Sequence, residues 1–199
     1  LGNQLLILFN LIYLSEKHNY KFIISFKDLN SKKYNFFKNI NFSKKLDKKN
    51  IQYFHKINEK NLSYESINLK NKNTILKGYF QSYKYWWNFR NKIKDYLYIN
   101  YGLLNNIQKL YNDFEKPILA IHFRLGDYLT NPDNFSICSI DYFRKCLKFY
   151  NLNNYQIILF SDNLLLASEI LKPLKLKYLN ANDFYKDEES QLYMLMLSN

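Results

Sequence analysis

The residues best equipped for chemistry lie at positions 121–128, in the sequence Ile-His-Phe-Arg-Leu-Gly-Asp-Tyr. This segment holds one of the three arginines, one of the four glycines and one of the three histidines of the chain. An arginine that is backed by an aspartate is suited to bidentate binding of a diphosphate or a carboxylate. The alternative is a structural ion pair between Arg124 and Asp127 at the end of a strand.

The residues before this segment predict the element that positions it. Pro117 is followed by an apolar run at 118–123, which is typical of a parallel strand buried on both faces. Open parallel sheets bind ligands at the carboxyl ends of their strands. Residues 122 and 124 alternate, so we expect His122 and Arg124 to project to the same side. Gly126 permits a turn, after which Asp127 folds back toward Arg124 or a backbone amide.

Strands and helices alternate along the rest of the chain. After residue 117 the pattern predicts a doubly wound α/β domain with helices at 140–149, 163–171 and 188–197 and strands at 155–160 and 176–179. Before it we expect helices at about 3–17, 83–97 and 103–114 and strands at 21–26 and 74–80. The Lys- and Asn-rich stretch at 27–73 predicts surface loops with brief regular elements.

Composition excludes several classes of protein. The 199 residues are 47% hydrophobic, which excludes disorder, and no apolar run approaches the roughly 18 residues of a membrane-spanning helix. Cys138 and Cys146 cannot form a disulfide framework. The net charge of +12 suggests nucleic-acid binding, but 26 of the 29 basic residues are Lys, without the guanidinium that phosphate readers favour. Residues 1–116 carry +13 and residues 117–199 carry −1, which predicts a domain boundary near 116.

Several segments, spread over almost the whole chain, resemble the α-1,2-fucosyltransferases of glycosyltransferase family 11. The His-x-Arg-x-Gly-Asp-Tyr sequence at 122–128 resembles the signature of that family. The other matching segments are Leu-Gly-Asn-Gln-Leu at 1–5, Gly-Tyr-Phe-Gln-Ser at 78–82 with Tyr85, Phe-Ser-Asp at 160–162 and the helical stretch at 192–197. These segments occur along the chain in the same order as in that family.

The resemblance implies a GT-B-like α/β fold of two Rossmann-like domains with parallel sheets. Residues 1–116 would form the acceptor-side domain and residues 117–199 the GDP-fucose-binding domain. The family's strand before residue 1 and its Asn-Ser-Ser-Phe-Ser-Trp-Trp segment after residue 199 are not in this sequence, so the resemblance implies a fragment with an incomplete second domain. Leu125 stands where many relatives have a second arginine or another polar residue.

The implied activity is an inverting, metal-independent transfer of L-fucose from GDP-fucose to the 2-hydroxyl of a galactose in a β-galactoside glycan. The donor is a substrate, and no cofactor, metal or nucleic-acid partner is expected. The expected location is the cytoplasm or the periphery of a membrane, and a Golgi membrane only if an anchor precedes residue 1. The alternatives are a relative that only binds nucleotide or glycan, and a basic nucleic-acid-binding module.

Catalytic roles fall on three residues of the signature. Without a metal, fixed donors must offset the charge that grows on the departing GDP, and Arg124 takes that role. His122 would orient a phosphate or ribose oxygen, or hold Arg124. Asp127 would set the loop and is the nearest candidate base, with a purely structural role as the alternative.

The resemblance also implies binding residues. The donor-binding set is Gly2, Asn3, Gln4, Arg124, Gly126, Tyr128, Ser161 and Asp162. The acceptor-binding set is Gln81, Tyr85 and Trp86. Several of these residues have a structural alternative. Asn3 and Asp162 could be helix N-caps, and aromatic residues at helical spacing could belong to a core.

Overall fold

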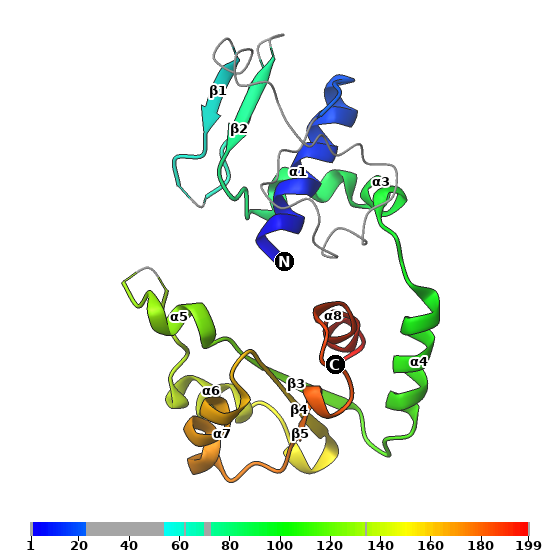
Figure 1. Cartoon of the computed structure of the whole chain (residues 1–199), viewed down its shortest axis with the longest axis vertical. Coiled ribbons are helices and arrows are strands. Elements are labelled where there is room, and N and C mark those ends of the chain that lie inside the picture. The colour runs from blue at the N-terminus through cyan, green and yellow to red at the C-terminus, as the bar shows by residue number, and fades with distance from the viewer. Residues whose placement is uncertain (1, 23–53, 62, 70–72, 134, 199) are drawn as a thin grey trace. The chain divides into compact units, whose positions relative to one another are not determined.

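The computed structural model describes residues 2–22, 54–61, 63–69, 73–133 and 135–198. They form two compact units, Leu1–Ile99 and Asn100–Asn199, and each unit is a mixed α/β structure with a short parallel sheet (Figure 1). The α/β class and the parallel strands are therefore confirmed, in a form compatible with a Rossmann-like fold. Most of the strand expected at 21–26, and all of residues 27–53, lie outside the described residues.

The first unit is built around helix α1 (Gly2–His18), close to the helix expected at 3–17. Its buried Leu8 and Ile12 pack with Ile93, and Phe9 meets Trp86 with ring centroids 5.2 Å apart. Beside it, β1 (His55–Asn58) and β2 (Thr74–Lys77) pair in parallel, Asn58 opposite Lys77. The strand expected at 74–80 is thus shorter than predicted, because the chain turns at Gly78.

The helix expected at 83–97 is wrong as a continuous element. The segment consists of the short turns η2 (Tyr83–Tyr85), η3 (Trp87–Phe89), α3 (Arg90–Ile93) and η4 (Lys94–Tyr96). At the breaks, Trp86 and Phe89 leave helical geometry while their rings pack edge-on against Phe9 and Tyr13 of α1. Packing against α1 therefore overrides the local helical periodicity.

The second unit contains a three-stranded parallel sheet in the order β3 (Ile118–Phe123), β4 (Gln156–Ser161) and β5 (Leu179–Asn180). The register pairs Ile118 with Gln156 and Phe123 with Ser161, so β3 and β4 end at the same edge. Strands at 118–123 and 155–160 are confirmed. The strand expected at 176–179 is only two residues long, because the chain first passes through a turn in which Lys175 is left-handed.

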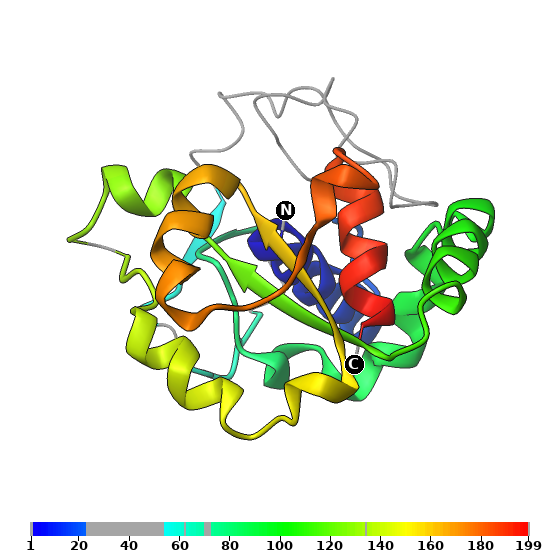
Figure 2. The same cartoon turned by 90° about the horizontal axis from the view of Figure 1, so that it is seen from below.

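Helices cover both faces of this sheet, which explains why the central residues of β3 and β4 are apolar. Helices α6 (Ile140–Leu147) and α7 (Leu164–Leu171) pack on the face that carries Leu119, Ile121 and Leu159. Helices α4 (Tyr101–Asn112) and α8 (Glu188–Leu197) lie on the opposite side (Figures 1 and 2). All four lie close to their expected positions.

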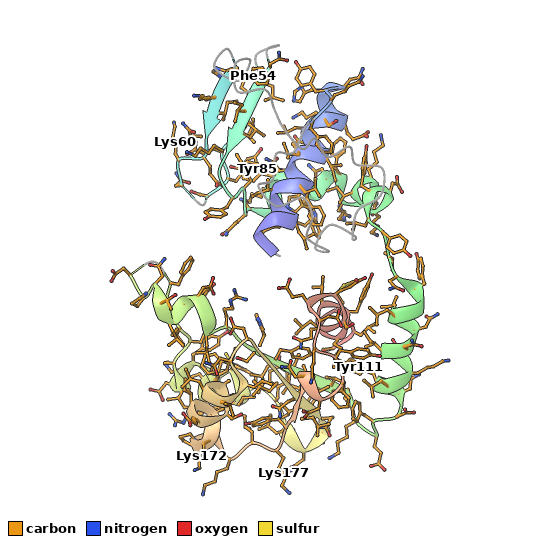
Figure 3. The ribbon with its side chains drawn as sticks, in the orientation of Figure 1. Phe54, Lys60, Tyr85, Tyr111, Lys172 and Lys177 are labelled. Atoms are coloured by element: carbon orange, nitrogen blue, oxygen red, sulfur yellow. The ribbon has the colours of Figure 1, made fainter. Side chains whose placement is uncertain are left out.

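The division between the units falls after Ile99 and not near residue 116 as the charge pattern suggested. Helix α4 belongs to the second unit because it packs against α8, where the Tyr111 hydroxyl donates to the carbonyl of Met194 at 2.9 Å (Figure 3). The charge pattern could not reveal the boundary after Ile99, since residues 100–116 carry two lysines and two acidic residues and are neutral overall. The totals of +13 and −1 are the same for either boundary.

Within the described ranges, no helix has both the length and the apolar character needed to cross a bilayer.

Helix α8 depends on a cap that can be tested. Asp187 accepts hydrogen bonds from the Ser190 amide at 2.8 Å and the Ser190 hydroxyl at 2.7 Å. Partial desolvation opposes the charge, but these bonds outweigh it and lower the pKa of Asp187 below 3.8. The stabilisation is therefore present above pH 3.8 and lost as the pH falls through the folded-state pKa.

We expect Asp187→Ala to reduce the free energy of unfolding by about 1 kcal/mol at pH 7, because the α8 N-terminus loses its acceptor. Urea denaturation monitored by circular dichroism measures this loss. Glu169→Ala, at an exposed position within α7, is the control and should change stability much less. Equal stability of Asp187→Ala and the unaltered chain would contradict the capping role.

Candidate functional site

The signature segment begins at the end of β3. Ile121 and Phe123 are buried, whereas His122 and Arg124 are exposed, as the alternation predicted. Residues Gly126–Thr130 form a short helix, α5, which the sequence did not suggest. Leu125, the residue before it, is fully buried. The non-polar residue at this position therefore anchors the loop in the core beneath His122 and Arg124.

Two carboxylates contact the Arg124 guanidinium. Asp127 Oδ1 lies 2.9 Å from both Nε and Nη2, and Asp162 Oδ2 lies 3.1 Å from Nε. The exposed fractions of the side chains are 48% for Arg124, 59% for Asp127 and 29% for Asp162. The expected contact of Asp127 with Arg124 is confirmed. Asp162, which follows β4, provides the second carboxylate.

The Asp162 side chain also accepts hydrogen bonds from backbone amides of the loop. Its Oδ1 accepts from the Leu125 amide at 2.8 Å, and the Gly126 amide also donates to this carboxylate. Partial desolvation raises the pKa of Asp162, but the two amides and Arg124 outweigh it, so the net pKa lies below 3.8. The N-cap interpretation of Asp162 is wrong, because Asn163 caps α7 by accepting from the Leu166 amide at 3.2 Å.

Ser161, the last residue of β4, links the ends of β3 and β4. Its hydroxyl donates to the carbonyl of Phe123 at 2.7 Å and accepts from the Asn163 amide at 3.1 Å. The side chain is buried, so its hydrogen bonds tie β3 to β4 at the edge that carries Arg124.

His122 lies beside this charge cluster. Partial desolvation, and after it the positive charge of Arg124, lower the pKa of His122 from 6.5, while Asp162 acts in the opposite direction. A histidine with this pKa is neutral at pH 7 and can both donate and accept a hydrogen bond. Tyr128 lies on α5 and stacks on Phe135 with centroids 4.7 Å apart; no motif signalled Phe135.

The remaining predicted donor residues lie in the first unit. Gly2, Asn3 and Gln4 form the first turn of α1. The helix begins at Gly2, so Asn3 lies within its first turn. The structure therefore groups His122, Arg124, Asp127, Ser161 and Asp162 at one sheet edge and places these three residues in the other unit.

Two of the predicted acceptor residues are packed inward. Tyr85 is 3% exposed, and its hydroxyl accepts from the Glu65 amide at 3.1 Å (Figure 3). Trp86 is half-buried against Phe9, which agrees with the core interpretation, and Gln81 is half-buried. Tyr83 and Trp87 in the same segment are exposed, and the Arg90 guanidinium lies 4.6 Å from the Trp87 ring centroid.

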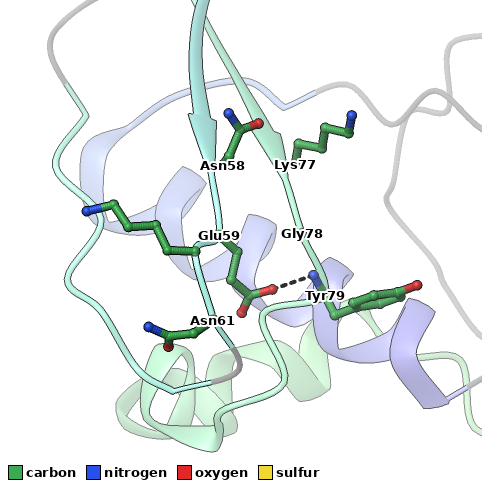
Figure 4. A pocket seen from close by; sticks show the side chains of 7 residues that line it. Asn58, Glu59, Asn61, Lys77, Gly78 and Tyr79 are labelled. Atoms are coloured by element: carbon green, nitrogen blue, oxygen red, sulfur yellow. Dashed lines mark hydrogen bonds between the residues drawn. The ribbon is translucent and has the colours of Figure 1, made fainter. Parts of the chain in front are cut away.

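Glu59 is a polar residue of the first unit that the sequence did not single out. Its Oε2 accepts from the amides of Tyr79 at 2.6 Å and Phe80 at 3.0 Å, beside an open pocket of about 620 Å³ (Figure 4). A Cβ on Gly78 would lie 2.4 Å from Glu59 Cβ, so Gly78 gives the carboxylate room. Glu59 sits in a Lys- and Asn-rich stretch without a motif, and only the fold reveals its partners.

Comparisons with known proteins add no assignment. No family model, curated protein or solved structure matches the chain. In the part of the chain that the structure describes, no cluster of three or more His, Cys, Asp or Glu side chains is placed to hold a metal ion.

Gly126 gives a test of the packing at this edge. A Cβ added to Gly126 would lie 2.6 Å from Asp162 Oδ2, which the loop amides hold in place. We expect Gly126→Ala to lower the free energy of unfolding by about 1–3 kcal/mol, as overpacking does. Urea denaturation measures it, and the penalty should shrink in an Asp162→Ala background, where the opposing atoms are gone.

The matched control is Gly102→Ala. A Cβ there meets only Asn100 Oδ1, at an ordinary 3.5 Å, within helix α4. Alanine favours helices over glycine, so stability should stay the same or rise by up to about 0.5 kcal/mol. A Gly126→Ala variant as stable as Gly102→Ala would contradict the close approach of Asp162.

The charges around His122 predict its titration. In an NMR titration of the ring protons, the pKa of His122 should lie below 6.5. Arg124→Gln should raise that pKa by removing a nearby positive charge, and Asp162→Asn should lower it further. Asp141→Asn on α6, whose partner is Arg144, serves as the control and should leave it unchanged. A lower His122 pKa in Arg124→Gln would contradict this arrangement.

Proposed function

We propose that the chain is a glycosyltransferase that moves L-fucose from GDP-fucose to the 2-hydroxyl of a galactose-containing glycan. The observation that carries the proposal is Arg124, held by Asp127 and Asp162 at the carboxyl edge of a parallel sheet. This edge is where parallel α/β sheets bind ligands. The family resemblance supplies the identity of the donor and acceptor, and a GT-B arrangement of two Rossmann-like domains is part of the proposal.

In this reaction the principal task of the protein is to stabilise the leaving group. As the bond between fucose and the β-phosphate breaks, negative charge grows on GDP. Arg124 offers a fixed positive charge and guanidinium donors to that diphosphate, with no need for a metal in the proposed step. Neutral His122 donates one hydrogen bond to a phosphate or ribose oxygen.

The acceptor hydroxyl must lose a proton to a base. Asp127 is on the same loop as Arg124, but its Oδ1 already accepts two contacts from the guanidinium. We therefore assign Asp127 to charge balance and leave the base unassigned. The proposed location is the cytoplasm or the periphery of a membrane.

The decisive variant is Arg124→Ala. Removing a charged group that contacts the transition state costs about 2–5 kcal/mol, so acceptor-dependent release of GDP should fall by about 30-fold or more. The assay incubates the chain with GDP-fucose and lactose or N-acetyllactosamine and measures free GDP.

Arg144→Ala is a matched control. Arg144 is 49% exposed and pairs with Asp141 at the same three-residue spacing as Arg124 and Asp127. It should retain normal turnover. Near-normal turnover of Arg124→Ala would overturn the assignment of Arg124. GDP binding without turnover would favour a relative that only binds nucleotide, and oligonucleotide binding that survives moderate salt would favour a nucleic-acid-binding module.

A further inference from the structure

The two carboxylates on Arg124 are held in different ways. Asp162 is 29% exposed and accepts from the amides of Leu125 and Gly126 in addition to Arg124. Asp127 is 59% exposed, and its contact with Arg124 is an ion pair between two solvent-accessible side chains. Exposed pairs of this kind contribute little to stability, because water solvates both groups when they separate.

An anion that binds Arg124 must share it with these carboxylates or replace one of them. Displacing Asp162 would leave two loop amides without their acceptor, and unpaired buried donors are costly. Displacing Asp127 returns an exposed carboxylate to water and frees Nη2 of the guanidinium, while Nε keeps its contact with Asp162. Asp127 is therefore the carboxylate that gives way.

We propose that Asp127 is a displaceable counter-anion that competes with the diphosphate of a nucleotide for Arg124, whereas Asp162 is the positioning residue that keeps Arg124 and its loop in place. The proposal rests on the proposed function, because it takes the diphosphate of GDP as the incoming anion. It assigns opposite effects to two carboxylates that contact one guanidinium.

The test is the affinity for GDP, measured by calorimetry on the whole chain. Asp127→Asn removes the competitor and should tighten GDP binding about two- to fivefold, the range expected for an exposed ion pair. Inorganic pyrophosphate, used as a second probe, should show the same gain. The gain should vanish when Asp127→Asn is combined with Arg124→Ala, because the competition needs the guanidinium.

Asp141→Asn is the control for charge. It makes the same change in net charge on the same unit and removes a carboxylate from an exposed i, i+3 pair with Arg144. GDP affinity should stay unchanged. A gain of equal size in Asp141→Asn would overturn the proposal, since general attraction of the anion would then explain both results.

Asp162→Asn should weaken GDP binding at least tenfold. Guanosine, which lacks the diphosphate, separates positioning from folding, with its binding followed by saturation-transfer NMR. If Asp162 positions Arg124, guanosine binding persists in this variant while GDP binding falls. A parallel loss of both ligands would show a merely structural role and overturn that part of the proposal.

The outcomes also separate this proposal from the proposed function. If Arg124→Ala weakens GDP binding but Asp127→Asn leaves it unchanged or weaker, the competition is overturned and the nucleotide site stands. If the unaltered chain does not bind GDP, or binds it equally well without Arg124, both are overturned.

Discussion

The carboxylate of Asp162 is the constraint on which the arrangement around Arg124 depends. Because β3 and β4 run in parallel with Phe123 opposite Ser161, the residues that follow the two strands meet at one edge. Asp162 uses this proximity to accept from the Leu125 amide and to contact Arg124. Ionisation strengthens both interactions, and the same interactions keep the pKa of Asp162 low. A side chain that follows the neighbouring strand thereby helps to fix the loop.

The sequence predicted the parts of the fold whose cause is local. Residues 118–123 are apolar because helices cover both faces of the sheet, and such a run stands out without knowledge of the neighbours. Helix α8 was predicted at its observed limits, and the structure adds that Asp187 caps its N-terminus. The candidate site was chosen by a general rule, since the scarce polar residues His122 and Arg124 lie at the carboxyl end of a buried parallel strand.

Features with a distant cause could not be predicted. The helical segment at 83–97 is broken by aromatic packing against α1, more than 70 residues earlier. The boundary between the units depends on contacts of α4 with α8. The charge pattern along the sequence does not reflect these contacts, because residues 100–116 are neutral overall. The close approach that requires a glycine at 126 comes from Asp162, and that at 78 comes from Glu59. The sequence singled out Gly126 as a turn residue, but the close contact at each glycine is visible only in the fold.

Both units fix a sheet edge with the same physical device. Glu59 directly follows β1 and accepts from the amides of Tyr79 and Phe80, which follow the neighbouring strand β2. Asp162 directly follows β4 and accepts from the amide of Leu125, which follows the neighbouring strand β3. Each carboxylate satisfies donors that the ladder no longer pairs, and each leaves a negative charge at an edge suited to ligands. An anion site at such an edge needs a cation beside the carboxylate, and in the second unit Arg124 fills that place. The positive charge of Arg124 is partly offset by the negative charges of Asp127 and Asp162. These nearby charges, more than the net charge of +12 on the whole chain, therefore set how strongly this edge attracts an anion.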